Sequence, residues 1–264
     1  IAYYLPQFHP IPENDAWWGK GFTEWTNVAK AKPLFRGHEQ PKLPADLGFY
    51  DLRVPEVREL QAQMAKDAGI EGFCYWHYWF GHGQRLLERP FNEVLASGKP
   101  DFPFCLGWAN ESWTGIWHGS GDKILMKQKY PGTEDYEAHF YELLPAFKDK
   151  RYITVDDKPV FLVYNVFSLP DVNQFSDIFR KLAQKNGLNG IYLIASNAGY
   201  NWNPAEGGFD ASTFSPHSNI YLFDVSLKSR IKRKIRKTKV LSDIYGFFTN
   251  KPIYTFDYKD ALAT

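Results

Sequence analysis

One carboxylate lies among indole rings in residues 107–113, which read Gly-Trp-Ala-Asn-Glu-Ser-Trp. The segment follows an apolar run, residues 102–106, whose composition is typical of a buried strand. Apolar walls raise the energy of an ionised carboxylate and can tune it for proton transfer. Indole faces suit the C–H faces of a sugar ring. The pattern therefore predicts a carbohydrate site with Glu111 as its leading carboxylate and first candidate catalytic residue. The alternative is a structural carboxylate that pairs with a buried arginine or caps a helix.

Glycoside hydrolysis usually needs a second carboxylate, about 5 Å from the first for retention of configuration and further away for inversion. Glu24 is the natural candidate, because it lies in a Gly- and Trp-rich loop that reads Gly-Phe-Thr-Glu-Trp at residues 21–25. A loop-bracing role is the alternative for this residue.

Polar and aromatic residues also gather where predicted strands end, and ligand pockets are apolar with a few placed polar groups. We predict that these residues contact substrate: Tyr4, Gln7, His9, Glu24, Trp25, His77, Trp79, Trp108, Asn110 and Trp113. For each histidine the competing interpretation is a hydrogen-bonded residue of the core.

Strand-like and helix-like segments alternate along the chain. Strands are expected within residues 1–8, 72–80, 102–108, 160–164, 190–195 and 209–214, and helical spacing of apolar residues marks 57–68, 136–147 and 172–182. This order favours a parallel sheet with helical crossovers. No Gly-x-Gly-x-x-Gly or P-loop supports a nucleotide-binding open sheet. Because the polar residues fall at the carboxyl ends of strands, we predict an α/β fold of the (β/α)8 barrel type, incomplete, with about six strands present.

Composition narrows the class of protein further. At 264 residues, one barrel domain over 1–264 is expected. Hydrophobic residues at 44% and charged residues at 23% exclude a disordered chain, and a net charge of +1 gives no global field for nucleic acid. With two cysteines, a disulfide scaffold is excluded. No ligand spacing indicates zinc and no Gly-x-Ser-x-Gly indicates a serine hydrolase, so no metal or cofactor is predicted.

Residues 226–239 form a basic excursion within the expected domain, with eight lysines and arginines between Lys228 and Lys239. If this stretch formed a helix, only a narrow stripe of its surface would be apolar. A solvated excursion is one interpretation, and contact with phosphate or anionic lipid is the other. No apolar run is long enough for a membrane span and no signal peptide is visible, which favours a cytoplasmic or membrane-peripheral location.

Five motifs resemble one known family. They are Tyr-Tyr-Leu-Pro-Gln-Phe-His-Pro at residues 3–10, Trp-Trp-Gly-Lys-Gly-Phe-Thr-Glu-Trp-Thr-Asn-Val at 17–28, Leu-Pro-Ala-Asp-Leu-Gly-Phe-Tyr-Asp-Leu-Arg at 43–53, Gly-Phe-Cys-Tyr-Trp-His-Tyr-Trp-Phe at 72–80 and Trp-Ala-Asn-Glu-Ser-Trp at 108–113. They look like the glycoside hydrolase family 99-like proteins, also called WbsX-type proteins. The resemblance runs from residue 1 to about residue 217.

The resemblance implies a (β/α)8 barrel. It also implies an activity on glycans, because members of the family are described as glycosyltransferases of lipopolysaccharide or capsular polysaccharide biosynthesis. It implies a fold similar to that of endo-α-1,2-mannosidases, which retain configuration and need no metal. Their catalytic carboxylates lie in a Glu-Trp-x-Glu motif near the end of the barrel. Residues 1–264 lack this motif, so the resemblance places the main catalytic pair beyond Thr264. The leading interpretation is hydrolase-like action on the glycosidic bonds of a bacterial surface polysaccharide or lipid-linked glycan. The alternatives are a glycosyltransferase and a non-catalytic glycan-binding protein.

Overall fold

The computed structural model describes residues 1–34, 37–115, 120–196, 198 and 202–213. The chain divides into two compact units, one made of residues 1–24 and 49–214 and the other of 25–48 and 215–264. The single domain expected over 1–264 stays a prediction, and the basic excursion 226–239 lies outside the described residues. The site described below belongs to the first unit.

The first unit is built on a parallel sheet. Its strands, in spatial order, are β1 (Ala2–Tyr4), β2 (Phe73–His77), β3 (Phe104–Trp108), β7 (Lys158–Val163), β8 (Tyr192–Ala195) and β9 (Ala211–Ser212). Every neighbouring pair along this path is parallel, and the short β6 (Thr154–Val155) adds an antiparallel partner to β7. The predicted parallel sheet of about six strands is confirmed.

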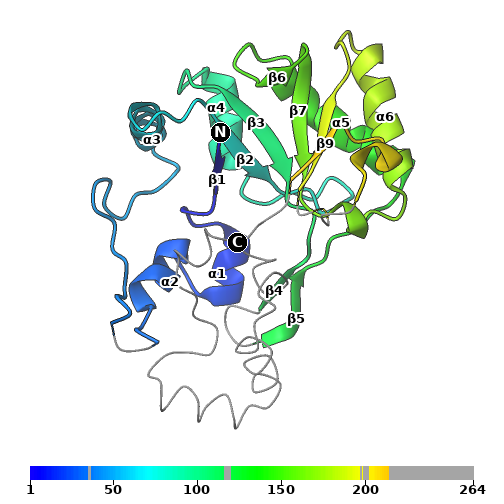
Figure 1. Cartoon of the computed structure of the whole chain (residues 1–264). Coiled ribbons are helices and arrows are strands. Elements are labelled where there is room, and N and C mark those ends of the chain that lie inside the picture. Colours follow the sequence, from blue (N-terminus) through cyan, green and yellow to red (C-terminus); the bar gives the residue numbers. More distant parts are fainter. Residues whose placement is uncertain (35–36, 116–119, 197, 199–201, 214–264) are drawn as a thin grey trace, which may run out of the picture. The chain divides into compact units, whose positions relative to one another are not determined.

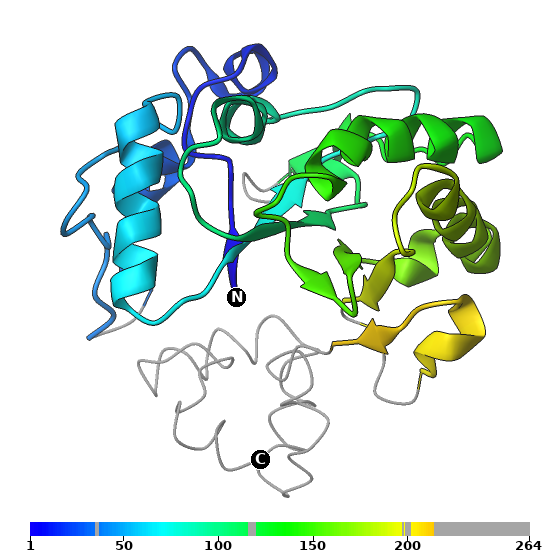
Figure 2. The ribbon, with the colours of Figure 1, turned by 90° about the horizontal axis from the view of Figure 1, so that it is seen from above.

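Four helices connect or flank these strands: α3 (Pro55–Asp67), α4 (Arg89–Ser97), α5 (Thr133–Phe147) and α6 (Val172–Lys185). They lie along one side of the sheet, as Figures 1 and 2 show. Helical periodicity predicted α3, α5 and α6 but not α4. This helix is short and opens with Arg89-Pro90, where proline suits the first turn because its missing N–H is not needed there. Among the described residues, no helix is both long and apolar enough to cross a membrane.

The loops contain further elements that periodicity did not predict. They are α1 (Pro12–Trp18), α2 (Glu24–Lys30), an antiparallel hairpin of β4 (Trp113–Gly115) and β5 (Ser120–Met126), and the 3-10 turns η2 (Val166–Ser168) and η3 (Pro204–Gly207). The hairpin places Trp113 directly after the segment that carries Glu111.

Residues along each strand alternate between two faces of the sheet. The covered face packs on the helices: Phe104 meets Phe91 of α4, and Phe161 stacks on Phe179 of α6 with ring centroids 5.6 Å apart. Phe161 and Phe179 are fully buried. Each such ring contributes roughly 1.5–3 kcal/mol through burial, so the main core lies between sheet and helices.

The opposite face, which we call the inner face, carries Tyr3, Cys74, Trp76, Gly107 and Leu162. The sheet is curved, and this face lies on its concave side. The Tyr3 hydroxyl of β1 lies close enough to Ser196 after β8 and Thr213 after β9 for both to lower its pKa, although β1 and β9 are the two ends of the strand order. A side chain can bridge the ends only if the sheet curls around it. Curling parallel strands with helices on the outside are the arrangement of a (β/α)8 barrel, and the predicted fold class is confirmed.

Candidate functional site on the inner face

The inner face presents an aromatic platform made of Tyr3, Trp76 and Tyr164. The rings of Tyr3 and Trp76 stack with centroids 4.8 Å apart and planes 7° apart, and Tyr164 meets Trp76 edge-on at 5.5 Å. Tyr3 is 54% exposed, and Trp76 and Tyr164 are half-buried. The three side chains therefore hold each other in place through ring contacts.

Gly107 explains how the platform fits against the sheet. Trp76 of β2 pairs in register with Gly107 of β3. A Cβ at Gly107 would lie 3.1 Å from Cζ3 of Trp76, 3.2 Å from Sγ of Cys74 and 3.3 Å from Cδ2 of Leu162. These distances are tighter than ordinary van der Waals contact, so a side chain here would displace the indole. The glycine of the 107–113 segment therefore makes space for Trp76.

Partial burial raises the pKa of the Tyr3 hydroxyl, and the nearby hydroxyls of Ser196 and Thr213 oppose that rise. The phenol stays neutral at physiological pH and can both donate and accept. A neutral hydroxyl beside an exposed ring is the combination that binds a sugar, which offers both hydroxyls and an apolar C–H face.

Asn110 joins the carboxyl ends of β3 and β7. Its side-chain amide donates to the Asn165 carbonyl at 2.8 Å and to the Tyr130 hydroxyl at 3.0 Å, and its Oδ1 accepts from the Asn165 N–H at 2.8 Å. The residue is fully buried. Because its donors and its acceptor are already used, the structure gives Asn110 a positioning role for the loops that carry Glu111 and Asn165.

Glu111 is exposed, and its Oε1 accepts a hydrogen bond from Nδ2 of Asn165 at 2.9 Å. The carboxylate is thus oriented by a residue that Asn110 holds. Burial raises the pKa of Tyr130 to about 12, and the negative charge of Glu111 adds to that rise. Asn165, which lies just after β7, is thus the hydrogen-bond partner of the leading carboxylate.

Gln7, Tyr78 and Trp113 form a second polar and aromatic group of the first unit. Nε2 of Gln7 donates to the Tyr78 hydroxyl at 2.7 Å, and Tyr78 meets Trp113 edge-on at 5.2 Å. Burial is the main cause that raises the pKa of Tyr78, and the charge of Glu24 raises it further. The structure thus brings Glu24 within electrostatic reach of this group. Trp25 belongs to the second unit.

The structure places four of the predicted contact residues on the covered face instead. Tyr4 donates to Oε1 of Gln61 in α3 at 2.6 Å. Trp108 is 1% exposed and donates its indole N–H to the Trp79 carbonyl at 2.9 Å. Trp79 itself is 4% exposed and donates to an Asp135 carboxylate oxygen at 3.0 Å. These side chains are enclosed between sheet and helices, so we leave them out of the proposed site.

His77, the fourth of these residues, pairs with His139 of α5 on the covered face. Their Nε2 atoms lie 2.9 Å apart, and both rings are buried. Burial lowers the pKa of His77 to about 3 and that of His139 well below its usual range. Both imidazoles are therefore neutral at physiological pH, and one ring donates to the other.

Strand parity accounts for the placement of His77 and Trp76. His77 shares the face of Phe73 and Tyr75, whereas Trp76, one residue earlier, shares the face of Cys74. A count in steps of two along residues 73–77 could have separated them, because the side chains of a strand alternate strictly. Nearness to a strand end alone could not.

Known proteins show which family this arrangement belongs to. A profile of the family described as "Glycosyltransferase WbsX" matches residues 1–264. The "Uncharacterized protein WxcX" of Xanthomonas campestris pv. campestris strain B100 is 44% identical over 216 residues, which cover 82% of this chain and 31% of that protein. The protein of the same name from strain ATCC 33913 matches equally. The chain thus spans about a third of the length of these curated relatives.

Solved structures of a GH99 endo-alpha-mannosidase from Bacteroides thetaiotaomicron share the fold. One, in complex with BIS-TRIS-propane, has a TM-score of 0.51 at 14% identity and covers 83% of this chain and 62% of that chain. Another has a TM-score of 0.50 at 13% identity, with 86% and 67% covered. At such identities the likeness concerns the fold, whereas the profile match over the whole chain assigns the family. The chain belongs to the WbsX glycosyltransferase family.

Proposed function

We propose that this chain forms the substrate-binding face of a carbohydrate-active enzyme that acts on glycosidic bonds. The observation that carries the proposal is the inner face, where the platform of Tyr3, Trp76 and Tyr164 lies on the same curled sheet as the oriented carboxylate of Glu111. Ring faces take the C–H side of a sugar, and a carboxylate accepts hydrogen bonds from its hydroxyls. Family membership supports the same class of substrate.

The substrate that we propose is a bacterial surface polysaccharide or a lipid-linked glycan, and the proposed chemistry resembles that of an endo-α-mannosidase. In such chemistry one carboxylic acid protonates the leaving oxygen and a second carboxylate stabilises or attacks the anomeric carbon. Glu111 and Glu24 are the carboxylates of this chain that we propose to touch substrate. Within this proposal, Glu111 binds sugar hydroxyls or assists proton transfer.

Replacement of Glu111 tests the proposal in the full-length protein. Glu111→Gln keeps the shape but loses the charge, and we expect glycan binding or turnover to fall about tenfold because a charge-assisted hydrogen bond becomes a neutral one. Glu59→Gln, at an exposed position of α3, is the matched control and should change neither. Equal activity of the Glu111 variant and the control would remove Glu111 from the site.

Glycosyl transfer from an activated donor is the second candidate, favoured by the description of the family. Incubation with α-mannan and, separately, with sugar nucleotides distinguishes the two reactions. Release of oligosaccharide identifies a hydrolase, and loss of donor with a lengthened acceptor identifies a transferase. Binding without turnover of either would show a glycan-binding protein and would contradict the proposed catalysis.

A further inference from the structure

An aromatic pair, Phe167 and Trp202, lies past the carboxyl ends of β7 and β8. Phe167 belongs to η2, which begins three residues after the last residue of β7, and Trp202 lies between β8 and η3. Phe167 is 63% exposed, and its ring meets that of Trp202 edge-on with centroids 5.9 Å apart. We call these two residues the rim pair. They follow strand ends on the side of the sheet where barrel enzymes bind their substrates.

The fold supports Trp202 and leaves Phe167 open. The indole meets the buried ring of Phe209 at 6.0 Å, and a Cβ at Gly207 would lie 2.9 Å from its Cζ2. A side chain at position 207 would therefore displace the indole. Val166 is 2% exposed, so the chain turns this side chain inward and the next one outward. A single apolar residue at a surface needs no explanation, whereas an exposed ring resting on a second, supported ring forms a platform.

Residues 164–167 connect the rim pair to the site on the inner face. Tyr164 belongs to the platform described above, and Asn165 donates from Nδ2 to Oε1 of Glu111 at 2.9 Å. Asn165 and Phe167 are two residues apart, so their Cα atoms lie within about 7 Å of each other. A ring, the partner of the carboxylate and a second ring thus follow one another along one short segment.

Two oxygen atoms beside the rim pair can accept further hydrogen bonds. Glu111 uses Oε1 for Asn165, and neither its Oε2 nor the Oδ1 of Asn165 has a partner among the residues that the structure describes. Glu111 is exposed, and Asn165 is half-buried. Sugar hydroxyls donate to carboxylate and amide oxygens, and the C–H face of a sugar suits a ring. Acceptors and an exposed ring therefore occur together here.

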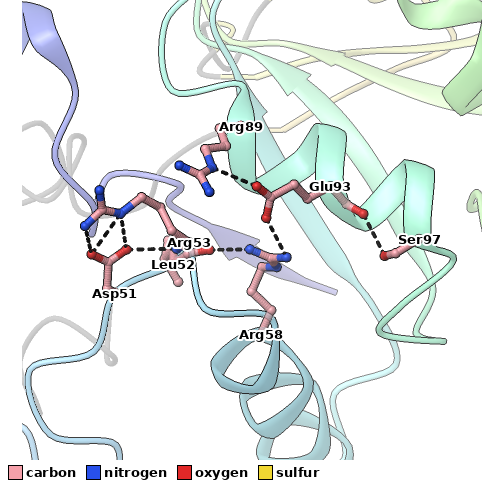
Figure 3. Close-up of polar contacts among 7 residues, drawn as sticks. All are labelled: Asp51, Leu52, Arg53, Arg58, Arg89, Glu93 and Ser97. Atoms are coloured by element: carbon pink, nitrogen blue, oxygen red, sulfur yellow. Dashed lines mark hydrogen bonds and ion pairs between the residues drawn. The ribbon is translucent and has the colours of Figure 1, made fainter.

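The charged groups at the starts of α3 and α4 differ, because they are engaged with one another. Figure 3 shows three arginines and two carboxylates there: Arg53, Arg58, Arg89, Asp51 and Glu93. Each arginine forms an ion pair with one of these carboxylates, at 2.6 to 2.8 Å. His9, one of the predicted contact residues, is 1% exposed and thus beyond the reach of a ligand. The negative charge of Glu111 disfavours an anion, so the open groups suit a neutral ligand rich in hydroxyls.

We propose that Phe167, supported by Trp202, binds one further sugar residue of a glycan whose neighbouring residue contacts Glu111. This inference rests on the proposed function and extends it, because the substrate is then an oligosaccharide chain that runs from the inner face to the rim pair. The C–H face of the further sugar lies on the Phe167 ring, and one of its hydroxyls donates to Oδ1 of Asn165. Phe167 thereby determines specificity for chain length.

Calorimetric titration of the full-length protein with α-linked manno-oligosaccharides of one to four residues tests the subsite. We expect the affinity of the parent to rise once the oligosaccharide is long enough to reach Phe167. Phe167→Leu should lower the affinity for the longest oligosaccharide about fivefold, because stacking on the ring is lost, and should leave the affinity for mannose unchanged. Phe167→Tyr keeps a ring and should bind every length as the parent does.

Tyr141→Leu is the matched control, since it removes a ring that is 43% exposed on α5, and it should change no affinity. Thermal unfolding of both leucine variants should match that of the parent. Three results would overturn the subsite: a parent affinity that does not rise with chain length, a Phe167→Leu variant that binds the longest oligosaccharide as the parent does, or a loss that is equal for every length.

Variants of Glu111 separate this inference from the proposed function. Binding that depends on chain length and on Phe167 but not on Glu111 would support the subsite and contradict the role of the carboxylate. Weaker binding of every length by Glu111→Gln, with no effect of Phe167→Leu, would do the reverse. Sedimentation tests a second copy of the chain as the other occupant of the ring. A dimer that Phe167→Leu dissociates without changing glycan affinity would overturn the subsite.

Discussion

Both faces of the parallel sheet carry aromatic residues, but they differ in what the rings contact. On the covered face Trp108 is 1% exposed and its indole N–H is paired inside the protein. On the inner face Tyr3 is 54% exposed, and its ring stacks on the half-buried Trp76. The contrast teaches that aromatic residues near a strand end do not by themselves mark a site. The face on which each ring lies decides between core and surface.

The covered face should respond most strongly to truncation. Trp108→Ala removes a ring that packs on Phe175 and His139, and we expect a loss of about 3–5 kcal/mol in the free energy of unfolding, because a cavity forms in the core. Urea denaturation measures this. Phe167→Ala, at a ring that is 63% exposed, is the control, and it should cost about 0.5 kcal/mol or less. Similar costs for both variants would contradict the packing difference between core and surface.

The buried histidine pair should make the covered face sensitive to acid. The folded-state pKa of His77 is about 3 and that of His139 is also depressed, so below the unfolded value near 6.5 the unfolded chain binds protons first. The stabilising contribution is thus complete above pH 6.5 and falls by about 1.4 kcal/mol per pH unit for each histidine as the pH is lowered. The decline ends only near pH 3, the folded pKa of His77.

Urea denaturation between pH 6.5 and 5 isolates this effect from most carboxylates, which titrate lower. His139→Phe keeps a ring next to Trp79 and removes one titrating group, so it should reduce the slope by about 1.4 kcal/mol per pH unit. An unchanged slope in this variant would show that the pair does not govern the acid response.

Gly107→Ala should strain the contact between β3 and the platform. The new Cβ would lie 3.1 Å from the Trp76 ring, so we expect a loss of about 1–3 kcal/mol from overpacking, together with weaker glycan binding. Thermal or urea unfolding measures the first effect. Trp76→Leu in the same chain should relieve most of the strain, and additivity of the two substitutions would argue against a direct clash.

Trp76→Leu alone should have the smallest effect on stability and a selective effect on binding. We expect a change of about 1 kcal/mol or less in unfolding, because the ring is only half-buried. Glycan affinity should fall about tenfold, because the stacking surface is lost. Calorimetric titration with oligosaccharide checks this. A variant that binds glycan as well as the parent but loses several kcal/mol of stability would contradict the prediction. It would show that Trp76 stabilises the fold, as the rings of the covered face do, and does not bind glycan.

The local sequence pattern was sufficient to predict most strands of the sheet and three of the helices that pack on it. Apolar runs and helical spacing located the strands and α3, α5 and α6 to within a few residues. The pattern was insufficient for α4, which is short, and for the β4–β5 hairpin, whose pairing is irregular at both steps of its register. Short or bulged elements depend on neighbours that periodicity does not reveal.

The candidate site was predicted in part. The sequence analysis selected polar and aromatic residues near the ends of predicted strands, which we call the strand-end rule. This rule selected Glu111, Asn110 and Gln7, which the structure places in polar groups after the strands. It did not find Tyr3, Trp76 or Tyr164, because the rule ranks residues by nearness to a strand end and ignores the face on which they lie. It also did not separate the saturated Asn110 from the exposed Glu111, since hydrogen-bond saturation depends on partners far along the chain.

The sequence by itself determined the class of fold, the family resemblance and the carboxylate among indoles, because these depend on residue types and short-range spacing. Only the tertiary structure decided which aromatic residues face the helices and which face inward. It also decided that Tyr3 lies close to Ser196 and Thr213 across the curl, and that His77 pairs with His139 from a helix far along the chain. The physical reason is that burial, pairing and electrostatic reach are set by residues distant in sequence, which only the closed packing of sheet and helices brings together.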